Sequence, residues 1–335
     1  MVRKGYVRIP AGFFFGLLAF ALPRSGLLDG EKSISIHAVP IAAFEIDNPS
    51  RQRFGSLVFR GGLVLTSSER TFGGLSALRV QQDGALFVAC SDRALWLRGR
   101  IVYRDCRPAG IVDATLSPVL DADGLPASRW DTESMAEDRG TLYIGLERVP
   151  GIMRFDYGEQ GLLARGQPIA VPPELDDLPK NRGLEALAFV PKEHQLGGTL
   201  IALSERGLTA AGDIRAFLIG GPTPGSFAVK RLGEYDITDA AMLPGGDLLI
   251  LERLFSPERN LGMRIRRIPL SEIKPGALVD GPVLIEADTR FQIDNMEALS
   301  VHRTGSGETR LTLMSDDNFF PLQRTLLLQF ALPDE

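Results

Sequence analysis

The sequence predicts an all-β fold, a single β-propeller, and three observations lead there. Short apolar segments of strand length recur along the chain, helical periodicity is nearly absent, and a pattern repeats about every 50 residues. The 36 glycines and 22 prolines fit a chain with many tight connections. Repeats of this length are typical of propellers, in which each unit is a four-stranded blade.

The expected strands are rich in Leu, Ile, Val and Thr, and most begin at a glycine or a turn pair. Several end in a carboxylate, often followed by an arginine, as in "GLER" and "ILER". In chain order, the clearest strand segments are 57–67, 84–91, 140–147, 198–205, 246–253 and 309–316.

Each repeat begins with a polar lead-in, followed by a lead residue, two or three small or apolar residues, a glycine-containing turn and a strand. The lead residues are 57, 52, 54 and 58 positions apart, and they are Ser76, Glu133, Glu185, Asp239 and Glu297. The second set of polar positions is the carboxylates that end the strands: Asp92, Glu147, Glu205, Glu252 and Asp316.

The repeat length favours six blades, with five as the alternative. A mature chain of residues 22–335 divided by six gives about 52 residues per blade, close to the observed spacing. Segment 34–73 is interpreted as part of a blade whose missing strand comes from the C-terminal "RTLLLQFALP". Pairing of the two chain ends would close the ring and leave no exposed edges there.

The first residues have the layout of a secretory signal peptide, assigned to 1–21. A basic leader precedes the apolar run 11–22, and Ala19-Phe20-Ala21 is a small-x-small cleavage site. We therefore expect export, to a bacterial periplasm, of a propeller domain over 22–335. The alternative is a protein tethered by an uncleaved N-terminal anchor. The apolar run is shorter than the ~20 residues needed to span a bilayer, so no stable span is expected in the mature chain.

Net charge, cysteine content and histidine content limit the expected ligands, disulfide bonds and metal sites. A formal charge of −5 argues against nucleic acid or an anionic membrane as the main partner. A small anionic ester or other small ligand is expected because a cation bound by the repeated carboxylates, with flanking arginines, would attract it. A hairpin turning at Arg98-Gly99 would place Cys90 opposite Cys106, so these two residues are either disulfide-bonded or two unpaired, buried thiols. With three histidines in the chain, a zinc site is not expected.

Rotational equivalence of the blades would turn each repeated carboxylate into a ring around one axis. Converging carboxylates raise one another's pKa values or require a divalent cation, and hard oxygen ligands suit Ca²⁺. The competing interpretation is structural, with each acid bonded to backbone N–H groups or to an arginine of another blade. An arginine adjacent in a strand points to the opposite face, so it cannot easily neutralise its own neighbour.

The last repeat departs from the pattern because "SDDNF" places Asp317 where the other units have arginine. Asp316, Asp317 and Asn318 are the first choice for a cation site, and a polar turn capping backbone amides is the alternative. Glu185 and Glu297 complete the expected metal ligands. Glu205 or Glu252 is the candidate catalytic base, and Arg182 or Arg206 would bind an anionic substrate.

Segments such as "NRGLEALAF", "DNMEALSV" and "LMSDDNF" resemble an exported bacterial family of phytase-like proteins described as having esterase-like activity. The similarity extends from about Gly61 to the C-terminus. It implies a β-propeller, export, and hydrolysis of esters or phosphoesters. It assigns no role to individual residues. Two functions follow as hypotheses: a metal-assisted hydrolase of phosphate or carboxylic esters, and a non-catalytic propeller that binds a ligand or protein in the cell envelope.

Overall fold

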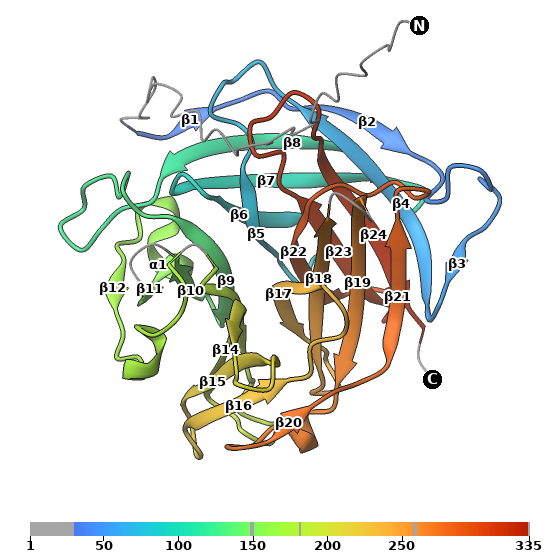
Figure 1. Ribbon diagram of the computed structural model, residues 1–335. Coiled ribbons are helices and arrows are strands. Elements are labelled where there is room, and N and C mark those ends of the chain that lie inside the picture. Colours follow the sequence, from blue (N-terminus) through green and yellow to red (C-terminus); the bar gives the residue numbers. More distant parts are fainter. Residues whose placement is uncertain (1–29, 148–150, 181, 257–259, 334–335) are drawn as a thin grey trace, which may run out of the picture.

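The computed structural model describes residues 30–147, 151–180, 182–256 and 260–333, and in this part of the chain five β-sheets surround a central axis (Figure 1). The fold is therefore a five-bladed β-propeller. The expected signal peptide lies outside the described residues. In the described part, no helix is both long enough and apolar enough to cross a membrane.

The first two blades are built from consecutive antiparallel strands. In the first, an additional N-terminal strand pairs with the outer edge. The order of this blade is β5 (Leu75–Val80), β6 (Leu86–Ser91), β7 (Leu95–Arg104), β8 (Arg107–Pro118) and β1 (Lys32–Ser33). The second blade has the order β9 (Thr132–Asp138), β10 (Thr141–Leu146), β11 (Gly151–Phe155) and β12 (Gln167–Pro168), with the short helix α1 (Tyr157–Gln160) before β12.

The third blade gains a short strand from the segment that connects two strands of the fourth. β20 (Leu278–Val279) leaves the fourth blade and pairs in parallel with the outer strand of the third. The third blade has the order β13 (Leu184–Phe189), β14 (Thr199–Leu208), β15 (Ile214–Gly220), β16 (Gly225–Val229) and β20. The fourth has the order β17 (Asp236–Met242), β18 (Leu248–Ser256), β19 (Asn260–Ile268) and β21 (Val283–Asp288).

The fifth blade joins both ends of the chain. Its order is β22 (Met296–Arg303), β23 (Thr309–Ser315), β24 (Thr325–Leu332), β4 (Leu57–Thr66) and β2 (His37–Ile41), with β3 (Arg53–Phe54) beside β4. N-terminal β4 and C-terminal β24 run side by side (Figure 1). The predicted ring closure is confirmed. The preference for six blades is wrong and the five-blade alternative is confirmed, because residues 37–66 supply outer strands of the fifth blade rather than a blade of their own.

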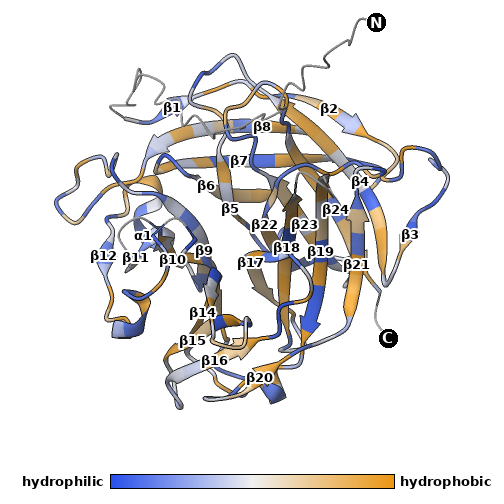
Figure 2. Cartoon of the chain, in the orientation of Figure 1, coloured by the Kyte–Doolittle hydropathy of each residue, from blue (hydrophilic) through white to orange (hydrophobic). Residues whose placement is uncertain are grey.

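The core consists of apolar layers between neighbouring blades. Each of the five buried clusters combines residues of two adjacent sheets, and the apolar side chains fall along the strands (Figure 2). Between the first two blades, Trp96 packs edge-on against Phe155 with ring centroids 5.3 Å apart. This stacking fixes the blades around the axis and therefore fixes where their innermost strands begin and end.

The turn after each innermost strand contains a glycine with positive φ, which explains the glycine in every sequence repeat. These residues are Gly84, Gly140, Gly198, Gly246 and Gly307, with φ between 71° and 99°.

The expected turn at Arg98-Gly99 is wrong, because β7 continues through both residues. Cys90 pairs with Trp96 instead, across a turn at residues 92–94. Both cysteines are free thiols, as the unpaired alternative expects, but the expected burial is confirmed for Cys90 and wrong for Cys106, which is exposed.

Candidate functional site

Every innermost strand carries a β-bulge at the same position, where it pairs with the second strand of its blade. One residue of the innermost strand is left without a partner there, and the strand is re-aimed locally. The bulge residues are Ser76, Glu133, Glu185, Thr238 and Glu297. These five side chains form one ring near the start of the innermost strands, and three of them are glutamates.

A second ring lies at the end of the second strands. Its members occupy equivalent places because each pairs with the residue two positions before the bulge. Asp92, Glu147, Glu205 and Asp316 each donate a backbone N–H to the carbonyl of that residue, over 2.8–3.0 Å. In the fourth blade the corresponding pair is Asp236 and Arg253. The second ring is therefore Asp92, Glu147, Glu205, Arg253 and Asp316.

Sequence spacing misassigned both members of the fourth blade by one residue. Thr238, not Asp239, is the bulge residue, and Arg253, not Glu252, is the member of the second ring. Side chains one position apart in a strand point to opposite faces, so this shift removes both acids from the site. Asp239 instead accepts hydrogen bonds from the backbone N–H groups of Leu299 and Ala240, and pairs with Arg79.

Arg253 lies between the carboxylates of two neighbouring blades. Its Nη2 donates to Oε1 of Glu205 at 3.0 Å, and its Nη1 donates to Asn295 at 2.7 Å and to Glu297. Its side chain is one-fifth exposed. This guanidinium compensates the charge on the side of the ring formed by the fourth and fifth blades.

The opposite side of the ring, formed by the second and third blades, has two groups of three carboxylates. Within each group, one oxygen from every residue lies within 4.8 Å of the others. Asp131, Glu133 and Glu147 form the first group, and Glu147, Glu185 and Glu205 form the second. Glu147 belongs to both groups. The acids are mostly buried, and Glu147, Glu185 and Glu205 each keep 8–9% exposure.

Burial and mutual repulsion raise the pKa values throughout these rings. Burial is the largest cause in each case, and the charges of neighbouring carboxylates add to it. The pKa values of Glu147 and Glu205 rise to about 7, and those of Glu133 and Glu185 rise well above the usual range. Such groups share protons or bind a cation because they cannot all be ionised at close range.

On the first blade, Asp92 is another carboxylate whose ionisation is opposed by burial and by a neighbouring acid. Burial, then the charge of Asp316, raises the pKa of Asp92 to about 8. Its Oδ1 is buried and has no hydrogen-bond partner among the described residues. Gly74 permits this approach, since a Cβ on it would lie 2.4 Å from that oxygen.

The sequence-predicted metal residues of the last repeat form a capped turn. Asp316 Oδ1 accepts from the backbone N–H of Asn318 at 2.6 Å. Asp317 accepts from the N–H groups of Gly74 and Phe319, both at 3.0 Å, and from the Thr325 hydroxyl at 2.9 Å. Asn318 is exposed with a φ of 49°. Of the three, Asp316 belongs to the ring, whereas the contacts of Asp317 and Asn318 are those of the polar-turn alternative.

The two predicted substrate-binding arginines differ in their contacts. Arg206 donates from Nε to Oδ1 of Asp236 at 3.0 Å and from Nη2 to Oδ2, so the two side chains form a bidentate pair. Arg182 is exposed in the segment that leads into β13. Arg206 is thus already paired within the protein, and Arg182 is the freer candidate for a substrate anion.

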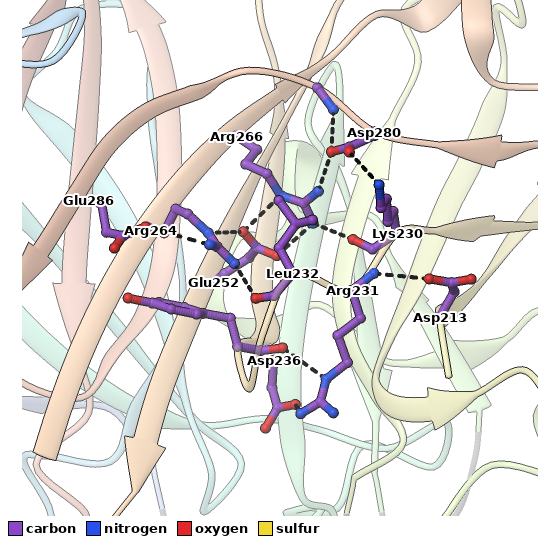
Figure 3. A network of polar contacts seen from close by, with 12 residues as sticks. Asp213, Lys230, Arg231, Leu232, Asp236, Glu252, Arg264, Arg266, Asp280 and Glu286 are labelled. Carbon is purple, nitrogen blue, oxygen red and sulfur yellow. Dashed lines mark hydrogen bonds and ion pairs between the residues drawn. The ribbon is translucent and has the colours of Figure 1, made fainter. Parts of the chain in front are cut away.

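Glu252 lies outside the rings, in a buried ionic network (Figure 3). Its Oε2 accepts from Arg264 Nε at 2.8 Å and from Arg266 Nε at 2.9 Å, and its Oε1 accepts from Arg266 Nη2 at 2.6 Å. Glu252 and Arg266 are both fully buried. Arg266 also reaches Asp280 and the carbonyl of Lys230, which ties the fourth blade to the third. A carboxylate held in this way has no access to a substrate, which argues against Glu252 as a base.

The axis is closed below the rings by Arg79. Its guanidinium donates to the carbonyl oxygens of Leu78, Leu187, Ala240 and Leu299, which belong to four of the innermost strands. A cavity of about 990 Å³ lies at the opposite end of the innermost strands and has Arg79 in its lining. Arg79 therefore separates that cavity from the carboxylate rings.

The sequence interpretation missed three residues of the site. Asp131 stands two positions before the bulge, in the polar lead-in of its repeat, and the lead-in residues were not considered as ligands. Arg253 was interpreted only as the neighbour of Glu252, and Glu147 only as one strand-ending acid among five. The bulge that aligns the fourth blade with the others is a feature of strand pairing, and the sequence carries no separate signal for it.

Comparison with known proteins adds one family and several distant structures. A family model described as "Phytase-like: Esterase-like activity of phytase" matches residues 70–319. No curated protein matches.

Among solved structures, the PQQ-bound aldose sugar dehydrogenase of Streptomyces coelicolor is 12% identical, with 89% of this chain and 99% of that chain covered and a TM-score of 0.41. A putative oxidoreductase (glucose dehydrogenase) of Thermus thermophilus is 15% identical, with 87% and 100% covered and a TM-score of 0.32. At these TM-scores the likenesses carry no argument about activity.

Proposed function

The chain belongs to this phytase-like family, and from that premise we propose that it is a divalent-cation-dependent hydrolase of phosphate or carboxylic esters. The observation that supports the proposal is the pair of carboxylate groups that share Glu147. Family membership covers most of the chain but gives only an esterase-like description, so the chemistry is argued from the site.

The donor set fits Ca²⁺. Every donor in the two groups is a carboxylate oxygen, and two oxygens on opposite sides of a calcium ion are about 4.8 Å apart at typical ligand distances of ~2.4 Å. Asp131, Glu133 and Glu147 would hold the cation, and Glu185, which is grouped with Glu147, would complete the donor set. Glu297 and Asp316 are placed less favourably, since Arg253 lies on their side of the ring.

A bound divalent cation would polarise the ester oxygen and lower the pKa of a bound water. The chain's own residues would do the rest. Glu205 lies between Arg253 and the shared carboxylates, so it is the candidate to accept a proton from the attacking water. Arg253 holds that carboxylate in place, and exposed Arg182 would contact an anionic group of the substrate.

We also propose that the protein is exported and acts in the periplasm. This proposal rests on the leader and cleavage pattern within residues 1–21, which lie outside the described residues.

The test combines metal analysis with hydrolysis of aryl phosphate and aryl acyl esters by the purified protein. We expect stoichiometric calcium, hydrolysis that EDTA abolishes and calcium restores, and a loss of at least about tenfold in kcat/KM for Glu147→Gln. Glu286→Gln is the matched control, because its carboxylate is half-exposed beside Arg264 on β21, the outermost strand of the fourth blade. Calcium binding without hydrolysis would favour the binding propeller. The absence of both calcium binding and hydrolysis would reject the metal site as well.

A further inference from the structure

The cavity at the end of the propeller opposite the carboxylate rings has no part in the proposed hydrolysis, and its size is that of a small-molecule site. It measures about 990 Å³, and its lining includes the ends of all five innermost strands. Ligand pockets typically measure about 300–1,000 Å³. The lining residues that follow the strands include exposed Gln82, Arg139 and Lys192, so solvent reaches the cavity from this end.

Arg79 forms the inner end of the cavity, and its guanidinium lies flat across the propeller axis. The four carbonyl groups that accept its hydrogen bonds all stand two positions after the bulge of their strand, at one height along the axis. The N–H groups of a guanidinium lie in its plane, so these carbonyls surround its edge and its two faces point along the axis. The Arg79 side chain keeps 10% exposure and is part of the lining, so one face is accessible from the cavity.

The side chains around this face are apolar in four of the five blades. The residues four positions after each bulge all line the cavity, and they are Val80, Glu137, Phe189, Met242 and Val301. We call the four apolar members the apolar wall. They stand two residues beyond the carbonyls that hold Arg79, which is about 7 Å along a strand. A flat ring stacked on the guanidinium would therefore lie within the apolar wall.

The charges in the lining are balanced, so the cavity does not select for a charged ligand. The guanidinium of Arg79 is paired with Asp239. Arg139 is paired with Asp138. Burial lowers the pKa of His302 to about 4, so this residue of the lining stays neutral. The remaining Asp, Glu, Lys and Arg residues of the lining are two acids and two bases: Glu137, Glu193, Lys192 and Arg303.

We propose that this cavity binds an uncharged, flat aromatic molecule of about two or three fused rings, stacked on the guanidinium of Arg79 within the apolar wall. A cation beside the face of an aromatic ring is attracted by the ring quadrupole, and the attraction is strongest where both groups are desolvated. A saturated ring system of similar size buries comparable apolar surface but has no such face. The site is independent of the proposed hydrolase, because Arg79 lies between the cavity and the carboxylate rings.

The experiment is isothermal titration calorimetry of the whole protein with 2-naphthol and with its saturated counterpart, decahydro-2-naphthol. We expect one saturable site per chain, with 2-naphthol bound about five- to thirtyfold more tightly because it alone stacks on the guanidinium. The affinity should be the same in EDTA and in calcium. Arg79→Lys keeps a cation beside Asp239 but has no flat face, so the two compounds should bind this variant equally.

A second variant tests the cavity while leaving Arg79 in place. Val301→Trp should abolish binding of 2-naphthol, because the larger side chain fills the cavity from the fifth blade. Val112→Trp is the matched control, since Val112 is 43% exposed on β8, in the outer part of the first blade, and lies outside the lining. It should bind 2-naphthol with unchanged affinity. This comparison applies even if Arg79→Lys does not fold.

Three results would overturn the proposal. The first is no saturable binding of 2-naphthol up to its solubility limit. The second is equal affinity of the unsubstituted protein for the two compounds, which would show that no ring stacks on Arg79. The third is binding that requires calcium or survives Val301→Trp, which would place the compound outside this cavity. None of these results depends on ester hydrolysis, so the hydrolase and the cavity stand or fall separately.

Discussion

Arg253 donates a hydrogen bond from Nη2 to Oε1 of Glu205 at 3.0 Å, and it does so from a ring position that is acidic in the other four blades. Arg253 thus compensates the charge of carboxylates on one side of the ring, and a bound ion would compensate those on the other side. The arrangement predicts where a metal binds and how the protein responds when the arginine is removed.

Replacement of Arg253 by Met should make the protein depend on divalent cations for stability. The change leaves Glu205 and Glu297 without their counter-charge, and breaking a largely buried ion pair costs about 3 kcal/mol. We expect a lower Tm in EDTA and a larger gain in Tm on adding calcium than in the unsubstituted protein. Differential scanning calorimetry with and without calcium measures both, and an unchanged response to calcium would contradict the assigned role.

The metal-free protein should lose stability as the pH rises. Asp92 and Glu297 have pKa values near 8, and Glu147 and Glu205 have values near 7, all raised first by burial. Because these pKa values exceed those of the unfolded chain, the folded state binds more protons between about pH 4 and pH 8. Their stabilising contribution is complete below the unfolded values and is lost as pH rises through the folded ones.

The measurement is Tm in EDTA from about pH 5 to about pH 9. We expect a downward slope that calcium reduces or reverses, since a cation replaces the protons. A Tm in EDTA that rises across this range would show that the carboxylates are ionised and compensated in another way.

Glu252→Gln should destabilise the fold without touching the chemistry. The substitution removes the shared anion of Arg264 and Arg266, and loss of one partner from a buried pair costs about 3–5 kcal/mol. Chemical denaturation should show this loss, while calcium content and kcat/KM of the folded protein stay unchanged. A selective loss of kcat at normal stability would restore Glu252 as a catalytic candidate.

Asp317→Ala should likewise separate a structural carboxylate from a ligand. Three hydrogen bonds end on Asp317, two from backbone N–H groups and one from Thr325, so the expected cost is about 1–3 kcal/mol. Bound calcium, measured by atomic spectroscopy, should remain stoichiometric. A protein of normal stability that has lost its calcium would show that Asp317 is a ligand after all.

The fold was largely predictable because its determinants are local. Turn glycines and apolar strands recur with the repeat, and the C-terminal "RTLLLQFALP" has the pattern of a strand that lacks a partner nearby. The number of blades was not predictable, since residues 37–66 look like the start of a sixth unit. Only pairing of β4 with β24 places them in the fifth.

By itself the sequence determined that carboxylates recur with the blades, because the apolar strands and turn residues that define each repeat are local sequence patterns. Which of them share a site was decided by tertiary structure. A bulge shifts the side-chain phase by one residue, and the hydrogen-bond register of the fourth blade turns Glu252 into a buried ionic partner and brings Arg253 to the ring. A shift of one residue along a strand moves a side chain to the opposite face of the sheet, and the pairing between strands determines which face it takes.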